Sequence, residues 1–245
     1  MIYIKSSREI EGIKKACAIW KKVKEVITKK VHIGMTTNEL DKIALDVITQ
    51  NNATPTFLNY GGFPKNICIS INEELIHGIP SSRKIKNGDM ITFDVGVTYM
   101  KYICDSAFTV ILGINKEAQK INDATYECLI ESIKEIKPDN VTGDISNKIE
   151  NIAKTNHYEV IKDYSGHGCG IKLHEDPQIS CFGDKHSGTK LKPGMILCIE
   201  PMLMTDSDEY YTESNNTVVA RNHKLTCHWE HMVLVTETGY EILTQ

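Results

Sequence analysis

ITFDVGV at residues 91–97 and ICDSAFT at residues 103–109 are two apolar, strand-like segments that each contain one aspartate. In the first segment the odd positions are apolar, so a β-strand would place Asp94 on the opposite face. Asp105 lies in the second segment. The two segments together predict a β-hairpin that carries two carboxylates.

The register of this hairpin decides how close the carboxylates lie. If the chain turns between Tyr99 and Met100, Asp94 faces Asp105 directly, with about 5 Å between their Cβ atoms. Like charges so placed destabilise a sheet, unless a cation lies between them or one of them is protonated. The hairpin therefore predicts either a cation site or two acids on a solvated face.

Helices are expected on both sides of the hairpin. Two capping boxes predict helix starts, Ser6 with Glu9 and Thr36 with Glu39. Helical spacing of apolar residues returns near residues 118–136 and 145–153. Residues 67–71 form a further strand-like run, and from residue 158 onward the pattern is strands and loops.

A short internal repeat suggests two similar halves. Residues 31–40 can be laid on residues 136–145, since both contain a helix end, a turn, a threonine, an acidic residue and a new amphipathic helix. If the match reflects duplication, it predicts two α+β halves related by a pseudo-two-fold axis, with a cleft between them. No linker separates the halves, so we expect one catalytic domain over residues 1–245.

Three glycines surround a histidine in SGHGCG, residues 165–170. Such spacing argues against a helix and lets the backbone approach a neighbour closely. A neutral imidazole held there, that of His167, is a good ligand for a transition metal. The alternative is a glycine-rich turn with a solvent-exposed histidine.

Two glutamates lie in apolar, strand-like surroundings, Glu200 after MILCI and Glu230 before HMVLV. A carboxylate in such a place is rarely buried without a partner. That partner is either one of the 28 Lys and Arg residues or a metal ion. His77, by contrast, precedes Gly78 and reads as a turn residue.

These groups taken together have the ligand chemistry of a dinuclear site with mixed oxygen and nitrogen donors. Hard carboxylate oxygens with one imidazole favour Mn, Fe or Co over a cysteine-rich structural zinc site.

Composition narrows the class of protein further. The formal charge of −4 argues against a protein that binds nucleic acid through phosphate contacts. No apolar stretch approaches the roughly 18 residues of a membrane helix, and the start MIYIK does not resemble a signal peptide. The eight cysteines contain no Cys-x-x-Cys pair, which is typical of free thiols in a reducing compartment. We therefore expect a cytoplasmic globular protein.

The same residues resemble those of the methionine aminopeptidases of the bacterial, type I kind. The resemblance covers nearly the whole chain and agrees in order and spacing. Its matching strings are CISINE through HGIP (residues 68–80), Asp94-Val95, Asp105, Gly166-His167-Gly168 with His174-Glu175, Ile199-Glu200-Pro201-Met202 and Trp229-Glu230-His231. It implies the α+β pita-bread fold, in which a curved antiparallel sheet is covered by helices.

The resemblance also implies a set of metal ligands. Asp105 and Glu230 would bridge two divalent ions, which could be Co, Mn, Fe or Zn. Asp94 would hold one ion, and His167 with Glu200 the other. The ions would lie about 3.5–4 Å apart and share a water or hydroxide.

The catalytic and substrate-binding residues follow from the same resemblance. Glu200 would move a proton from water to the leaving amine, and His174 would stabilise the oxyanion of the tetrahedral intermediate. His77 would position the scissile amide. The methionine pocket would be formed by Tyr60, Phe63 and Cys68, an apolar slot for a thioether.

The implied activity is removal of the N-terminal methionine from nascent proteins when the second residue is small. The implied partners are nascent polypeptide N-termini at the ribosome, with no direct requirement for nucleic acid or membrane, and the implied state is a monomer. The chain departs from the family pattern at Leu173, where relatives usually have Phe, and at Asn216, where many have Trp. Cys104 replaces the usual glycine.

Other readings of the same ligand set differ in what surrounds the core. Prolidases carry a large additional N-terminal domain, and type II methionine aminopeptidases carry a long insertion before the last glutamate. The eukaryotic type I form adds a cysteine-rich extension. A binding module of the same fold would have lost metal ligands, whereas all five are present here.

Overall fold

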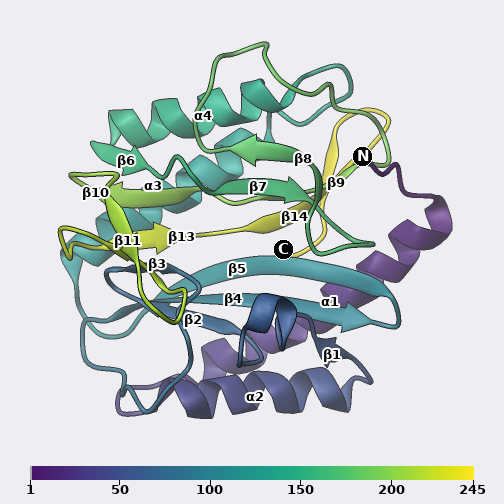
Figure 1. Ribbon diagram of the computed structural model, residues 1–245. Coiled ribbons are helices and arrows are strands. Elements are labelled where there is room, and N and C mark those ends of the chain that lie inside the picture. Colours follow the sequence, from purple (N-terminus) through teal and green to yellow (C-terminus); the bar gives the residue numbers. More distant parts are fainter. Residues whose placement is uncertain (1) are drawn as a thin grey trace.

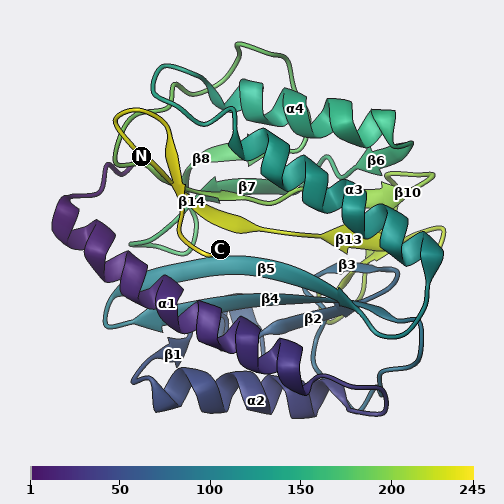
Figure 2. The same cartoon turned by 180° about the vertical axis from the view of Figure 1, so that it is seen from behind.

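The computed structural model describes residues 2–245, with four α-helices arranged in two pairs. The first pair is α1 (Ser7–Lys30) and α2 (Thr37–Gln50), and the second is α3 (Lys116–Ile133) and α4 (Thr142–Thr155). Figure 1 shows the two pairs on opposite sides of the molecule, with the strands between them. In Figure 2 α1 crosses the outer face of β4 (Met90–Tyr99) and β5 (Tyr102–Ile111).

The remaining elements are short strands and one 3₁₀ turn. They are β1 (Thr54–Pro55), η1 (Tyr60–Gly62), β2 (Cys68–Ile71), β3 (Glu74–Ile76), β6 (Tyr158–Val160), β7 (Ser165–Gly168), β8 (Glu175–Ser180), β9 (Ile196–Ile199), β10 (Met202–Thr205), β11 (Tyr210–Thr212), β12 (Val218–Ala220), β13 (Thr226–His228), β14 (His231–Val235) and β15 (Tyr240–Ile242). The strands pair antiparallel, with β2-β4-β5 in the first half and β15-β14-β9-β7-β8 in the second.

Local sequence signals account for the helix starts. The side chain of Ser6 accepts a hydrogen bond from the backbone of Glu9, and Thr36 does the same for Glu39, as the capping boxes predict. Each of these glutamates in turn accepts the backbone N–H of its capping residue. These reciprocal bonds satisfy donors that a helix start otherwise leaves unpaired.

The hairpin forms as predicted, but its predicted register is wrong. The centre of the turn lies one residue further along the chain than expected, which shifts the pairing of the two strands by two residues. Tyr99 pairs with Tyr102, so the turn is Met100-Lys101, and Met100 adopts the left-handed φ of 57° that this turn needs. Asp94 therefore pairs with Ala107, and Asp105 pairs with Gly96. The two aspartates are diagonal neighbours, whose Cα atoms lie about 7–8 Å apart by sheet geometry, instead of directly opposite.

The two segments of the internal repeat adopt the same local structure. Thr36 and Val141 are the N-caps of α2 and α4, and each also forms an isolated antiparallel bridge, with Lys84 and Lys190 respectively. Each half has its own apolar core, one around α1 and α2 and the other around α3 and α4. The fold thus consists of two pseudo-two-fold-related halves, as the pita-bread fold requires.

Hydrogen bonds join the halves where β5 meets the end of the chain. The Glu230 amide donates to the carbonyl of Ala107 at 3.1 Å, and the Ser106 hydroxyl donates to the carbonyl of Glu230 at 2.5 Å. Further along β5, the Thr109 hydroxyl donates to the carbonyl of His228 at 2.7 Å. These bonds hold residues of both halves at a common seam.

Within residues 2–245 no helix is both long enough and apolar enough to cross a membrane.

All eight cysteines are free and buried. Burial raises the pKa of the Cys181 and Cys227 thiols to about 12, and it raises the pKa of the Cys68 thiol well above its ordinary value. Since the thiolate is the reactive form, these groups are poor nucleophiles in the folded protein.

We expect iodoacetamide at pH 8 to leave the native thiols unmodified for as long as it takes to alkylate all eight in urea. Intact-mass spectrometry measures the number of adducts. Cys68 lines the cleft described below, so it should be the first to react if any does. Rapid alkylation of several native cysteines would contradict the buried arrangement.

Candidate metal centre and substrate cleft

A single cleft of about 820 Å³ brings the predicted site residues together. Its lining includes all ten of them: Tyr60, Phe63, Cys68, His77, Asp94, Asp105, His167, His174, Glu200 and Glu230. Most are far apart in the sequence, so only the folded chain could place them on one cavity.

The first half contributes Asp94 from β4 and Asp105 from β5, on the same face of the hairpin. Asp105 is only 5% exposed. The Oδ1 atoms of both aspartates are buried and have no hydrogen-bond partner among the described residues. Buried carboxylate oxygens without a donor are costly, so they indicate that a cation or a proton belongs beside them.

The second half contributes His167 from β7, Glu200 directly after β9 and Glu230 directly before β14. The Nε2 atom of His167 lies 3.4 Å from Oε1 of Glu200 and 3.8 Å from Oδ2 of Asp105. Its Nδ1 atom lies 2.9 Å from the carbonyl of Gly168. An N–H donated from Nδ1 to that carbonyl leaves Nε2 as a free lone pair facing the carboxylates.

Four carboxylates with raised pKa values therefore face one another. Burial raises the pKa of Asp94 to about 7. Burial and then the charges of neighbouring carboxylates raise the pKa values of Asp105, Glu200 and Glu230 well above their ordinary values. Among residues 2–245, no Lys or Arg side chain pairs with these four groups; the nitrogens beside Asp105 and Glu200 are those of the His167 and His228 rings.

The donor set fits divalent metal ions. It consists of carboxylate oxygens with one imidazole nitrogen, a combination that suits Mn, Fe, Co or Zn. Ligand atoms of Asp105, His167, Glu230 and Cys198 all lie within 4.8 Å of one another. Burial raises the pKa of the Cys198 thiol well above its ordinary value, so the oxygen donors are the better ligands.

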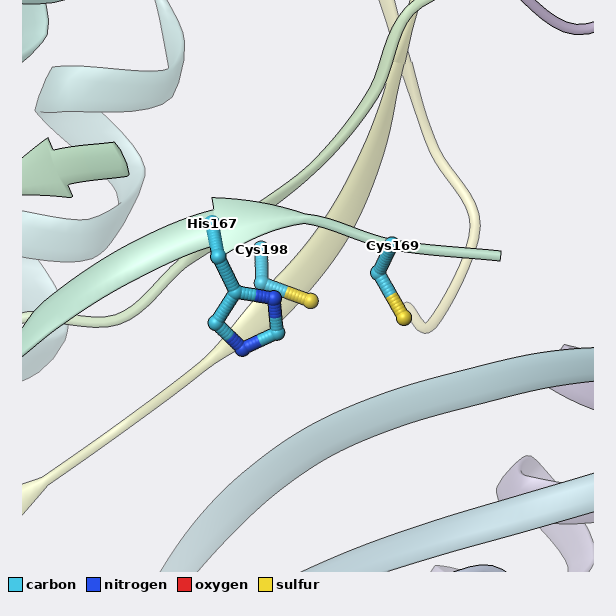
Figure 3. A group of neighbouring side chains, drawn as sticks. All are labelled: His167, Cys169 and Cys198. Atoms are coloured by element: carbon cyan, nitrogen blue, oxygen red, sulfur yellow. The ribbon is translucent and has the colours of Figure 1, made fainter. Parts of the chain in front are cut away.

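Sequence reasoning did not single out the cysteines behind this centre. Figure 3 shows His167 of β7 beside Cys169, which directly follows β7, and Cys198, which lies on the neighbouring strand β9. Their ligand atoms lie within 4.8 Å of that of His167. Only pairing of β7 with β9 places Cys198 opposite His167, so no short spacing could have indicated the group.

His228 is a second residue that the sequence did not indicate. It is 2% exposed, and neither ring nitrogen has a hydrogen-bond partner among the described residues. The ring lines the cleft, and its Nε2 atom lies 3.8 Å from Oε2 of Glu200. Burial lowers its pKa to about 3, so the imidazole is neutral near pH 7.

His77 and His174 lie around the opening of the cleft. The prediction that His77 begins a tight turn after the strand at residues 67–71 is wrong: that turn is Asn72-Glu73, and His77 follows β3 in an irregular segment with a positive φ of 61°. The Nδ1 atom of His174 lies 2.9 Å from the Tyr60 hydroxyl, and its ring centroid lies 4.5 Å from that of His167. Burial lowers the pKa values of both His77 and His174, which keeps both rings neutral.

An apolar pocket forms one wall of the cleft. Cys68 packs with Phe57 and Leu173 in a small buried cluster, and Phe63 packs against its side. Tyr60 is 49% exposed at the rim, where its hydroxyl contacts His174. Phe57 was not expected from the sequence; it belongs to the pocket because the chain turns back after β1.

The glycines around His167 allow close contact between strands, as predicted. A Cβ atom on Gly166 would lie 2.4 Å from the carbonyl oxygen of Cys198, and one on Gly168 would lie 2.4 Å from that of Asp176. Both partners are backbone atoms, so a side chain could not be accommodated without moving a strand.

We expect Gly166→Ala to destabilise the protein by about 1–3 kcal/mol, the usual cost of overpacking. Gly239→Ala is the control, since a Cβ atom there would have nothing within 4 Å. Urea denaturation followed by circular dichroism measures both variants. Equal stability of the two would show that β7 and β9 separate more easily than their geometry indicates.

Comparison with known proteins agrees with this geometry. The model of metallopeptidase family M24 matches residues 11–237. Methionine aminopeptidase of Mycoplasma genitalium is 41% identical over 250 residues, and methionine aminopeptidase 1 of Bacillus subtilis is 41% identical over 247 residues; each match covers 100% of both chains. The chain belongs to metallopeptidase family M24, as a hydrolase of the methionine aminopeptidase kind.

Solved structures give the same result. Methionine aminopeptidases from Rickettsia prowazekii and Thermotoga maritima each superpose with a TM-score of 0.98 at 33% and 36% identity, covering 100% of both chains. Prolidase from Pyrococcus furiosus also matches, with a TM-score of 0.80 and 26% identity, but only 65% of that chain is covered. The cleft seen here is thus set in the fold of a metallo-aminopeptidase.

Proposed function

We propose that this protein removes the N-terminal methionine from nascent polypeptides, with two divalent metal ions, and prefers a small second residue. The observation that carries the proposal is the cluster of four buried carboxylates and one imidazole beside an apolar pocket. A metallo-exopeptidase needs both parts, one to activate water and one to recognise the first side chain.

Charge supports two ions instead of one. Asp94, Asp105, Glu200 and Glu230 would carry four negative charges when ionised, and two divalent cations would balance them. By the same family resemblance, Asp105 and Glu230 would hold both ions, while Asp94 would complete one and His167 with Glu200 the other. The chemistry supplied on binding is polarisation of the substrate carbonyl and a lowered pKa for water.

Glu200 is the group we assign to proton transfer. Its carboxylate faces the cleft beside His167 and His228, close enough to accept a proton from water and return it to the leaving amine.

The histidines at the opening are assigned to the substrate amide. If the Tyr60 hydroxyl donates to Nδ1 of His174, the neutral ring carries its proton on Nε2 and donates it to the oxygen that becomes negative. His77, on the other side, is placed to bond the amide of the second residue. The methionine side chain would enter the pocket formed with Cys68 and Leu173.

The physiological setting is proposed from the same resemblance. The substrates would be polypeptide N-termini emerging from ribosomes in the cytoplasm, met by a monomer. The formal charge of −4 does not favour strong binding to nucleic acid, so the peptide itself would be the main ligand.

Mass spectrometry of a peptide panel tests the proposal. Protein loaded with Mn²⁺ or Co²⁺ is incubated with peptides that begin Met-Ala, Met-Gly, Met-Leu, Leu-Ala and Ala-Pro, and Glu200→Ala serves as the blank. Loss of methionine only before small residues, with none in the blank, is expected.

The other outcomes are distinct. Cleavage of the Ala-Pro peptide alone would favour a prolidase activity. Cleavage of Met-Leu as fast as Met-Ala would remove the proposed preference but keep the aminopeptidase. No cleavage by metal-loaded protein would reject the proposed substrate.

A further inference from the structure

The first residues of the chain lie against the loop that carries His174. The amide of Lys5 donates to the carbonyl of Gly194 at 2.9 Å, and Ile2 forms a parallel bridge with Asp176. Tyr3 is part of the cleft lining. The N-terminal segment, residues 2–5, is therefore a structural neighbour of the site although no predicted site residue lies in it.

A buried ion pair connects this segment to the loop. The Lys5 Nζ atom lies 2.5 Å from Oε2 of Glu175, and their side chains are 1% and 0% exposed. The ammonium group also donates to the carbonyl of Tyr3 at 3.3 Å. The pair joins residues 170 positions apart in the chain.

The other carboxylate oxygen of Glu175 shapes the loop itself. Oε1 accepts the backbone N–H groups of Ile171 and Lys172, each at 2.8 Å. These amides belong to the connection between β7 and β8, outside both strands. The Glu175 carboxylate therefore accepts two backbone hydrogen bonds that a neighbouring strand would accept in a sheet. The ion pair with Lys5 holds the carboxylate in the position where it can do so.

This loop carries two parts of the site, Leu173 in the apolar pocket and His174 at its rim. Both precede Glu175 directly, between the two amides and the carboxylate that binds them. A small rotation of the loop would move the His174 ring away from Tyr60 and shift the pocket wall together with it.

Stability alone does not account for such a pair. Replacing a buried ion pair by well-packed apolar side chains is often neutral or stabilising, because desolvation offsets the attraction. Apolar side chains, however, could not accept the two loop amides. The ion pair instead fixes one conformation of the loop, because it orients the carboxylate that accepts the two loop amides.

We propose that Lys5 and Glu175 are positioning residues for the aminopeptidase reaction, which act through His174 and Leu173. The proposal rests on the proposed function for its kinetic readout. In this proposal the N-terminal segment, besides leading into α1, helps to position residues of the site.

A double-mutant cycle tests whether Lys5 acts through His174. Lys5→Met, His174→Ala and the combined variant are compared for kcat and KM on a Met-Ala peptide, with metal content measured. Lys5→Met should lower kcat by about tenfold, as expected for a misplaced catalytic group, but cause little further loss when His174 is already Ala. An equal loss in both backgrounds would overturn the proposal.

Lys14→Met is the matched control for loss of a lysine from the same part of the chain. Lys14 pairs with Glu241 at 2.9 Å, but the two side chains are 35% and 46% exposed, and the pair does not contact the loop. The kcat of Lys14→Met should equal that of the parent protein.

Lys5→Met alone leaves the Glu175 carboxylate buried without its counter-ion and could unfold the protein. The variant Lys5→Met/Glu175→Leu removes both charges, so it should fold while the amides of Ile171 and Lys172 lose their acceptor. A folded double variant with reduced kcat is expected. A folded double variant with the parent's kcat would show that the pair has no positioning role.

A spectroscopic readout separates this proposal from the proposed function. ¹⁵N-histidine NMR of the Zn²⁺-loaded protein reports the Nδ1 environment of His174, which depends on its bond to Tyr60. We expect the signal to shift in the Lys5 variants and not in Lys14→Met. An unchanged signal would overturn the positioning role. If the signal shifts but the protein cleaves no peptide, the proposed function is rejected and the structural effect of Lys5 on His174 still holds.

Discussion

Glu200→Gln lowers kcat by about 1,000-fold if this carboxylate exchanges protons with water and the leaving amine, within the range measured for general acid–base groups. Glutamine keeps the size of the side chain and one oxygen that faces the metal site, but it cannot take up a proton near pH 7. The loss should fall mainly on kcat, since the methionine pocket is unchanged. Steady-state kinetics on a Met-Ala peptide measures it.

Two controls make this result specific. Metal analysis of the variant shows whether the loss comes from proton transfer or from an empty site, since Glu200 is also a proposed ligand. Glu74→Gln changes another half-buried glutamate, which pairs with Arg83 outside the cleft, and should leave kcat unchanged. A metal-loaded Glu200→Gln enzyme with more than a tenth of the parent's kcat would remove Glu200 from the mechanism.

The metal-free protein should lose stability as the pH rises from 7 to 8. The folded state holds protons on its clustered carboxylates at the start of this range, because the pKa of Asp94 is raised to about 7 and those of Asp105, Glu200 and Glu230 are raised well above their ordinary values. The unfolded chain, with ordinary values near 4, holds none. A folded state that binds more protons than the unfolded state loses stability as pH rises.

The range begins at 7 because buried histidines act in the opposite direction at lower pH. Burial lowers the pKa of His167 to about 4 and that of His231 to about 3, so the unfolded chain binds extra protons on them as the pH falls through the ordinary histidine value of about 6.5. Above pH 7 most of the unfolded histidines are neutral as well. The carboxylate cluster then dominates the slope, at pH values where few thiols ionise.

Divalent metal should abolish the slope, because cations replace the protons on the same oxygens. At a fixed free metal concentration the gain in stability should therefore grow as the pH rises, and it should be about 2.7 kcal/mol at the pH where that concentration is a hundredfold above Kd. Urea denaturation at several pH values, with EDTA or with Mn²⁺, measures both effects, and Asp94→Asn should make the metal-free slope shallower. A metal-free stability that rises between pH 7 and 8 would contradict the carboxylate cluster.

Elements that depend on neighbours along the chain were predictable. The capping boxes at Ser6 and Thr36 begin the first two helices because the bonds they make span only three residues. The alternation of apolar residues around Asp94 identified the strand for the same reason. The hairpin register was missed because it depends on the positive φ of Met100, which nothing in the side chain indicates.

The site was predictable in its chemistry but not in its surroundings. Carboxylates at the edges of apolar strands need a partner when buried, and this need pointed to metal only when the carboxylates were considered together with His167. His228 gave no such signal, because a histidine in an apolar run is more often a core residue. Its place beside Glu200 follows from the pairing of β10 with β13.

The sequence by itself determined the helices, the main strands and the ligand types, because all of these follow from local spacing and from the cost of burying charge. Only the tertiary structure decided which residues meet: the diagonal register of the aspartates, Phe57 in the pocket, and the hold of Lys5 on Glu175 across 170 positions. Such contacts depend on how the two halves pack against each other, and no short-range pattern encodes that packing.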